Sequence, residues 1–221
     1  ELKKLKSTGF FTSFFVGGLV AALVPIANTG FRTELFTSLE GSPLSILLNA
    51  NLQMVTMLNL ILIICGACLM YHTEYADHAI RRMLTLPLRG ESLFFGKALL
   101  LTLGFLFLLA LESASYAFCT MHWFEMTGDF IPELLKNMGF AALLTLPTLL
   151  FMLLVASACQ SMWVSLGIGV IFMSMGTVLP EGPFLLTLVP FVGRCRGLAS
   201  AGGDWTAYGA AWGAELRLFG L

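Results

Sequence analysis

Charged and histidine side chains gather in one window of this chain, residues 71–97, which reads YHTEYADHAIRRMLTLPLRGESLFFGK. Four side chains in it are of types that can ligate a metal ion, namely His72, Glu74, Asp77 and His78. A helical zinc site of the His-Glu-x-x-His kind needs its two histidines four residues apart, so that both lie on one face. This spacing is absent from the window, and we therefore predict no metal site there.

The end of the window, GESLFFGKA, is similar to a phosphate-binding Gly-Lys loop but lacks the spacing of one. Such a loop has four residues between its glycines and a Ser or Thr after the Lys. Here five residues separate Gly90 from Gly96, and Ala98 follows Lys97. We expect no ATP, and no other cofactor, to be bound by this chain. If the protein uses ATP and Mg²⁺, another subunit must supply the site.

Two polar residues interrupt long apolar runs. Glu112 lies within LLALESASYAF, and a carboxylate at the centre of a membrane span costs about 2.5–3.5 kcal/mol on insertion scales. Glu112 should therefore face other helices, be protonated, or form hydrogen bonds with neighbours such as Ser113 or Ser115. Its function would be a role in a substrate path or in gating; the alternative is a structural contact between helices. Asn59 is a second candidate of the same kind.

Catalytic motifs are absent from the sequence. We find no defensible Ser/His/Asp spacing, no paired carboxylates in an apolar run and no Gly-x-Ser-x-Gly motif. Cys65 and Cys68 form a Cys-x-x-Cys pair inside an apolar run, which favours two small residues on one helix face. Basic residues are too few and dispersed for nucleic acid. One enzymatic alternative remains, a small intramembrane protease or lipid transferase using Glu112 and His122, and it lacks a second acidic or histidine group at matching depth.

The composition excludes an ordinary soluble domain. Of 221 residues, 57% are hydrophobic and 11% charged, and the mean hydropathy is +0.87. The apolar residues form blocks of about 18 or more, the length of a membrane-spanning helix. We predict an all-α, multi-pass membrane protein with a single domain over residues 1–221 and about six spans.

The predicted spans follow the apolar blocks. They are Gly9–Asn28, Leu52–Tyr71, Leu93 to about Thr120, Met138–Cys159, Met162–Leu179 and a last stretch, Trp205–Leu221. The apolar piece Pro183–Val192 is too short to cross a bilayer and is bracketed by Pro and Gly, which predicts a re-entrant hairpin before the last span. The opening residues ELKKLKS predict an amphipathic helix lying in the membrane interface.

Basic residues set the expected orientation. With a cytoplasmic N-terminus, the inside segments hold Lys3, Lys4, Lys6, Arg81, Arg82, Arg89 and Lys97, and the outside segments hold Arg32, Lys136, Arg194 and Arg196. The excess of basic residues inside agrees with the positive-inside rule. The window 71–97 is therefore expected to be cytoplasmic.

The start of that window can form a short amphipathic helix. Asp77 and Arg81 are a favourable pair at i, i+4, and Pro87 disfavours helical backbone at the residue before it. A short helix joined closely to two spans can work as a lever, because packed helices move as rigid bodies. The alternative is a solvated connecting loop with ordinary surface charge pairs.

The motifs resemble those of the type-2 ABC exporter permeases. Three features support this resemblance: the ELKKLKS elbow, Glu74 at the end of the second span, and the segment IRRMLTLPLRGESLFFGKAL after it. In that family the coupling helix has the pattern Thr-x-Lys/Arg-x-Leu-x-x-x-Pro, and a Lys begins the third span. Matching positions here are Arg82, Leu84 or Leu86, Pro87 and Lys97, while Ala79 or Ile80 replaces the Thr. The small size and the lack of a large outer domain resemble the lantibiotic-immunity permeases.

The resemblance implies that transport and ATP hydrolysis are carried out by different subunits. Two permease subunits, identical or homologous, would pair in the cell membrane, and a dimer of cytoplasmic ABC ATPases, carrying ATP and Mg²⁺, would dock on the coupling helices. Glu74, Asp77, Arg81, Arg82 and Pro87 would then belong to the coupling segment. The cargo would be an amphipathic peptide released outward for self-protection, and the chain itself would be no enzyme. An exporter of lipids or drugs, or a sensor that keeps the same fold, are alternatives.

Overall fold

All regular structure in the described part of the chain is helical. The computed structural model describes residues 9–37, 43–76, 90–124, 130–159, 161–178 and 190–191. Its helices are α2 (Phe10–Phe31), α3 (Thr33–Thr37), α4 (Pro43–Ala76), α6 (Gly90–Trp123), α7 (Phe130–Ala158) and α8 (Met162–Val178). The predicted all-α class is confirmed for these residues.

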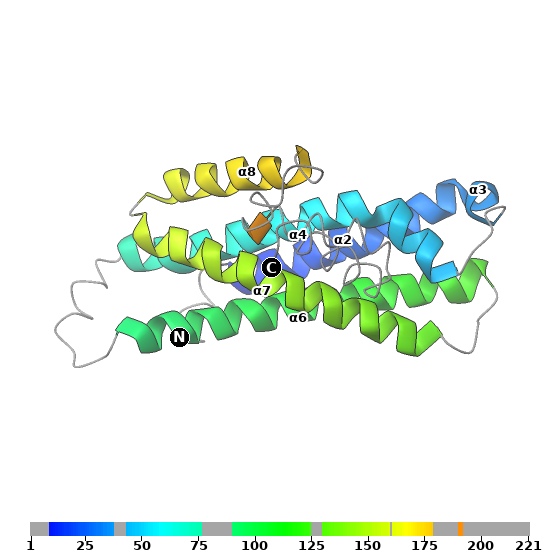
Figure 1. Ribbon diagram of the computed structural model, residues 1–221, viewed down its shortest axis with the longest axis horizontal. Helices are drawn as coiled ribbons and strands as arrows, with labels where there is room; N and C mark the ends of the chain where they lie inside the picture. Colours follow the sequence, from blue (N-terminus) through cyan, green and yellow to red (C-terminus); the bar gives the residue numbers. More distant parts are fainter. Residues whose placement is uncertain are drawn as a thin grey trace, which may run out of the picture.

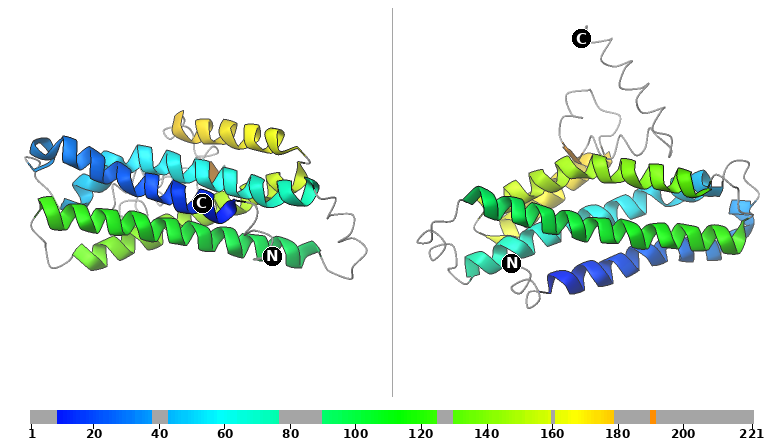
Figure 2. Two further views of the ribbon diagram at one scale, coloured as in Figure 1. Left: turned by 180° about the vertical axis from the view of Figure 1, so that it is seen from behind. Right: turned by 90° about the horizontal axis from the view of Figure 1, so that it is seen from below.

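The long helices lie side by side along one direction (Figure 1). Their directions alternate, so that the start of α2, the end of α4, the start of α6 and the end of α7 share one end of the bundle. We call this the inner end, after the predicted orientation, and the end that carries α3 the outer end. The views from behind and from below show the same arrangement (Figure 2). Helix α8 follows α7 after a short link and lies beside α4 over the inner half of the bundle.

Within the described ranges, four helices are long and apolar enough to cross a bilayer. They cover Phe10–Phe31, Pro43–His72, Leu93–Trp123 and Phe130–Ala158, and α8 contributes a shorter apolar stretch, Met162–Gly176. The chain is therefore a multi-pass membrane protein. The predicted elbow helix, most of the predicted hairpin and the last span lie outside the described residues.

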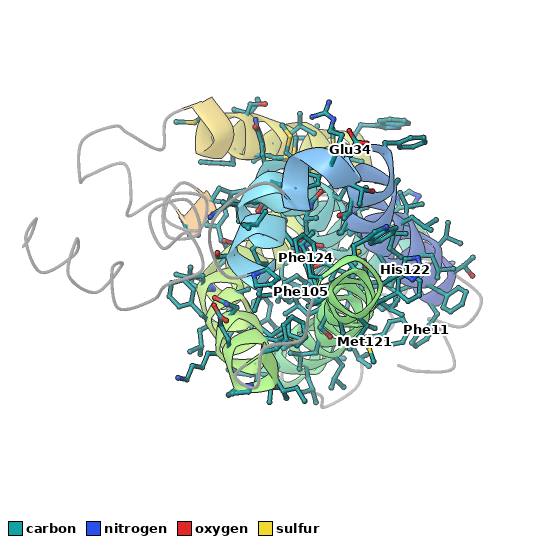
Figure 3. The ribbon with its side chains drawn as sticks, turned by 90° about the vertical axis from the view of Figure 1, so that its right-hand side faces the viewer. Phe11, Glu34, Phe105, Met121, His122 and Phe124 are labelled. Atoms are coloured by element: carbon teal, nitrogen blue, oxygen red, sulfur yellow. The ribbon has the colours of Figure 1, made fainter. Side chains whose placement is uncertain are left out.

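A buried apolar cluster joins α2, α4, α6, α7 and α8. Its largest fully buried members include Phe10, Leu60, Ile63, Leu101, Leu108 and Leu149. Other large apolar side chains lie on the outside of the bundle, as expected where lipid replaces water. Viewed from the outer end, Phe105 lies towards the middle and Phe11 at the margin (Figure 3), which agrees with exposed fractions of 2% and 46%.

Close approach of α2 to α4 depends on a glycine. A Cβ atom added at Gly66 would lie 2.6 Å from Cε2 of Phe14 and 2.9 Å from Cδ1 of Leu101. The Phe14 ring therefore occupies the space that a side chain at position 66 would need. Small residues at such contacts let membrane helices pack through van der Waals contact alone.

Two predicted boundaries were wrong at the outer end. Helix α4 begins at Pro43, nine residues before the predicted Leu52, and α7 begins at Phe130, eight residues before Met138. The polar residues there, read as a loop, have partners in the bundle. Asn51 is buried, accepts a 2.9 Å hydrogen bond from Nδ2 of Asn28 and donates to the Leu47 carbonyl. Phe130 is buried against a second apolar cluster at this end.

Candidate functional site

Asn59 and Glu112 meet inside the bundle. Nδ2 of Asn59, on α4, donates a hydrogen bond to Oε2 of Glu112, on α6, at 3.2 Å. The two side chains are 3% and 4% exposed. Asn59 lies near the middle of the span Pro43–His72, and Glu112 lies eleven residues, about 16 Å, before the outer end of α6. Two candidates that the sequence named separately are thus one buried polar pair.

Glu112 faces other helices, which is one of the three arrangements predicted for it, whereas the two neighbouring serines bind elsewhere. Oγ of Ser113 donates to the Ala110 carbonyl of its own helix at 2.8 Å. Oγ of Ser115 donates to the Ala22 carbonyl of α2 at 2.6 Å. Both hydroxyls therefore satisfy backbone carbonyls, and the amide of Asn59 supplies the donor to the carboxyl group. This hydrogen bond offsets part of the cost of placing a carboxyl group inside a membrane span.

A pocket opens beside this pair. Its cavity volume is about 80 Å³, room for several water molecules. Walls from α4, α6 and α7 enclose it, formed by Leu48, Asn49, Leu52, Val55, Thr56, Asn59, Leu109, Glu112, Ser113, Tyr116, Leu134, Asn137, Met138, Phe140 and Ala141. The walls are mainly apolar and include a few polar groups, which is the usual composition of a small-molecule site.

Lys97 forms a second polar contact, at the inner end. The side chain is 2% exposed, and its Nζ donates to the Met70 carbonyl at 3.2 Å. The same Nζ lies 3.7 Å from the centroid of the Tyr71 ring, a cation–π contact. Lys97 lies in the second turn of α6, and its two partners are near the end of α4. It therefore joins the two helices that flank residues 77–89.

The Cys-x-x-Cys pair serves packing. Sγ of Cys68 donates to Oγ of Ser165 at 3.3 Å, which joins α4 to α8. Cys65 and Cys68 are both free thiols. Among the described residues, no group of His, Cys, Asp and Glu side chains could hold a metal ion. For this part of the chain, the reading of small residues on one helix face agrees with the structure.

Comparison with known families decides the class of protein. The family described as ABC-2 family transporter protein matches residues 1–176, well over half of the chain. The chain belongs to this family. No curated protein and no solved structure matches it. As a member of the ABC-2 family it is a membrane subunit of a transporter, and such permeases generally work with an ATPase partner.

The enzymatic alternative fails on geometry in this ABC-2 permease. His122 is exposed near the outer end of α6, where its ring stacks on Phe118. Ten residues of helix separate it from Glu112, about 15 Å along the axis. The two groups therefore cannot act on one bond. The family match, to a transport subunit, agrees with a chain that is not an enzyme.

Most of the predicted coupling residues of the permease are not among the residues that the structure describes. Asp77, Arg81, Arg82 and Pro87 lie outside the described residues. Glu74 lies in the last turn of α4, where the backbone is helical as predicted. Sequence reasoning missed the contacts of Lys97, although a basic residue in the first turns of a long apolar helix was a visible signal.

Proposed function

We propose that this permease works in an ATP-driven exporter that moves an amphipathic peptide out of the membrane, in the manner of the lantibiotic-immunity permeases. A dimer of cytoplasmic ABC ATPases would supply ATP and Mg²⁺. A second permease subunit, identical or homologous, would complete the path. The N-terminal side and residues 77–89 would face the cytoplasm.

The contact of Lys97 with the end of α4 carries this proposal. A lever transmits motion only if both of its attachments are stiff, since a loose joint would absorb the displacement. The Nζ of Lys97 holds the Met70 carbonyl and the Tyr71 ring, so residues 77–89 connect two helices that are already joined. A partner that pulls on this segment would move α4 and α6 as one body.

The same two helices carry the buried polar pair. Asn59 is on α4 and Glu112 is on α6, and the pocket beside them has its third wall on α7. A joint movement of α4 and α6 relative to α7 would therefore change the shape of this pocket. This supports the proposal that Glu112 and Asn59 lie on the substrate path and respond to the ATPase.

Co-purification tests the proposal. The permease, extracted from its native membranes in mild detergent, is expected to co-purify with a soluble ATPase. The reconstituted complex should hydrolyse ATP faster when an amphipathic, lanthionine-bridged peptide is present. Stimulation by lipids or lipophilic drugs alone would favour those cargoes instead. A permease that purifies without any ATPase, and moves the peptide without ATP, would contradict the exporter.

A further inference from the structure

The pocket between α4, α6 and α7 contains a buried hydrogen-bond acceptor, Oδ1 of Asn59. Nδ2 of Asn59 is used by Oε2 of Glu112. Oδ1 of Asn59 is buried and accepts no hydrogen bond from the described part of the chain. A buried carbonyl oxygen without a donor costs about 1–3 kcal/mol. An atom in this position is satisfied when a ligand brings the donor.

Among the described residues that line the pocket, Glu112 is the one Asp or Glu side chain. The same described lining contains no Lys, Arg or His. In a medium of low dielectric constant, a carboxylate attracts a cation far more strongly than it does in water. The donor that best fits the site is therefore an ammonium group, which supplies both the positive charge and up to three N–H bonds.

The remaining walls specify the rest of the ligand. Most of the other lining side chains are apolar, and they come from all three helices: Leu48, Leu52, Val55, Leu109, Leu134, Met138, Phe140 and Ala141. The polar ones are Asn49, Thr56, Ser113, Tyr116 and Asn137. A free metal ion or a small hydrophilic amine would leave the apolar walls without a partner. A hydrophobic body next to the ammonium group would cover them and gain about 25 cal/mol for each Å² of apolar surface buried.

We propose that this pocket binds lipophilic amines, hydrophobic molecules or chain segments that carry a primary or secondary ammonium group. The ammonium would donate to Glu112 and to Oδ1 of Asn59, while the hydrophobic body lies against α4 and α7. That such an amine is also part of the exported cargo rests on the proposed function. Binding itself needs neither the ATPase nor ATP.

Titration with dansylcadaverine tests this, because its primary ammonium ends a narrow five-carbon chain that a cavity of about 80 Å³ can admit, while its fluorescent ring system stays at the mouth of the pocket. The permease is placed in phosphatidylcholine nanodiscs, and the signal of empty nanodiscs is subtracted. Glu112→Gln keeps the shape of the side chain but removes its charge, and we expect the affinity to fall about ten- to a hundredfold, the value of one or two charge-assisted hydrogen bonds. Glu34→Gln, at an exposed acid of α3 outside the pocket, should bind like the wild type.

Two further measurements keep the test decisive if Glu112→Gln fails to fold. The N-acetylated probe, tested on the wild type, should bind at least tenfold more weakly because it has lost its cation. Ala141→Phe should block binding by filling the pocket while leaving Glu112 in place. Equal affinity for the two probes, or unchanged amine binding in Ala141→Phe, would overturn the proposal.

The outcome is separable from that of the exporter assignment. Peptide-stimulated ATP hydrolysis without amine binding would remove the lipophilic-amine site and leave the exporter intact. Amine binding in a permease that never associates with an ATPase would support the lipophilic-amine site and contradict the exporter.

Discussion

Replacing Lys97 with Met is expected to reduce ATP-driven export at least tenfold while the protein remains inserted in the membrane. The substitution removes the hydrogen bond to the Met70 carbonyl and the contact with the Tyr71 ring. Their contributions are about 1.5–3 kcal/mol for the charged hydrogen bond and about 2 kcal/mol for a desolvated cation–π pair. The joint between α4 and α6 should therefore loosen.

Overall stability is a poor readout for this substitution. Removing a buried ammonium also returns its desolvation cost, and exchanging buried charges for apolar side chains is often neutral. The informative measurements are the export rate and the distribution of distances between spin labels placed on α4 and α6 near the inner end. Lys136→Met, at an exposed position on α7, is the matched control. Unchanged export together with an unchanged distance distribution would show that Lys97 does not hold the joint.

Ala substitutions at Glu74 and Arg82 are expected to uncouple ATP hydrolysis by the partner from peptide export by the permease. ATP hydrolysis by the partner should continue, whereas peptide export should fall at least tenfold, because the ATPase loses its grip on the proposed coupling segment, Glu74–Pro87. Export and ATP hydrolysis are measured in the same proteoliposomes. Matched controls are Glu34→Ala and Arg32→Ala, which alter exposed residues near α3 at the other end of the bundle. Normal export in both Glu74→Ala and Arg82→Ala would remove these residues from the coupling role.

Hydropathy predicted the helices but misplaced their outer ends. A block of apolar residues indicates a span because lipid offers no partner for a polar backbone. The same rule makes polar residues look like loop, and it fails when a tertiary partner exists. Asn51 has a tertiary partner in Asn28. Asn28 belongs to α2, and hydropathy treats α2 and α4 as separate segments. Helix α4 therefore continues to Pro43, where the sequence alone predicted a connecting segment.

The sequence predicted the two polar residues of the candidate site individually, but it did not predict that they contact each other. Glu112 and Asn59 stood out because each interrupts an apolar run. Their contact depends on the register of two helices whose pairing joins residues 53 positions apart, and no local pattern encodes that register. The neighbouring serines looked like better partners by sequence distance. Their hydroxyls instead bind backbone carbonyls, a choice that follows from helix geometry and packing.

Side-specific labelling of residue 82 tests the central claim, that the segment between α4 and α6 faces the cytoplasm, where an ATPase can grip it. Arg82→Cys is placed in a variant whose five native cysteines are replaced, with Arg32→Cys as the outer reference, and each is treated with a membrane-impermeant maleimide. We predict that Cys at position 82 reacts only in inside-out vesicles and Cys at position 32 only in intact cells. Reaction of position 82 in intact cells would contradict both the orientation and the coupling to a cytoplasmic ATPase.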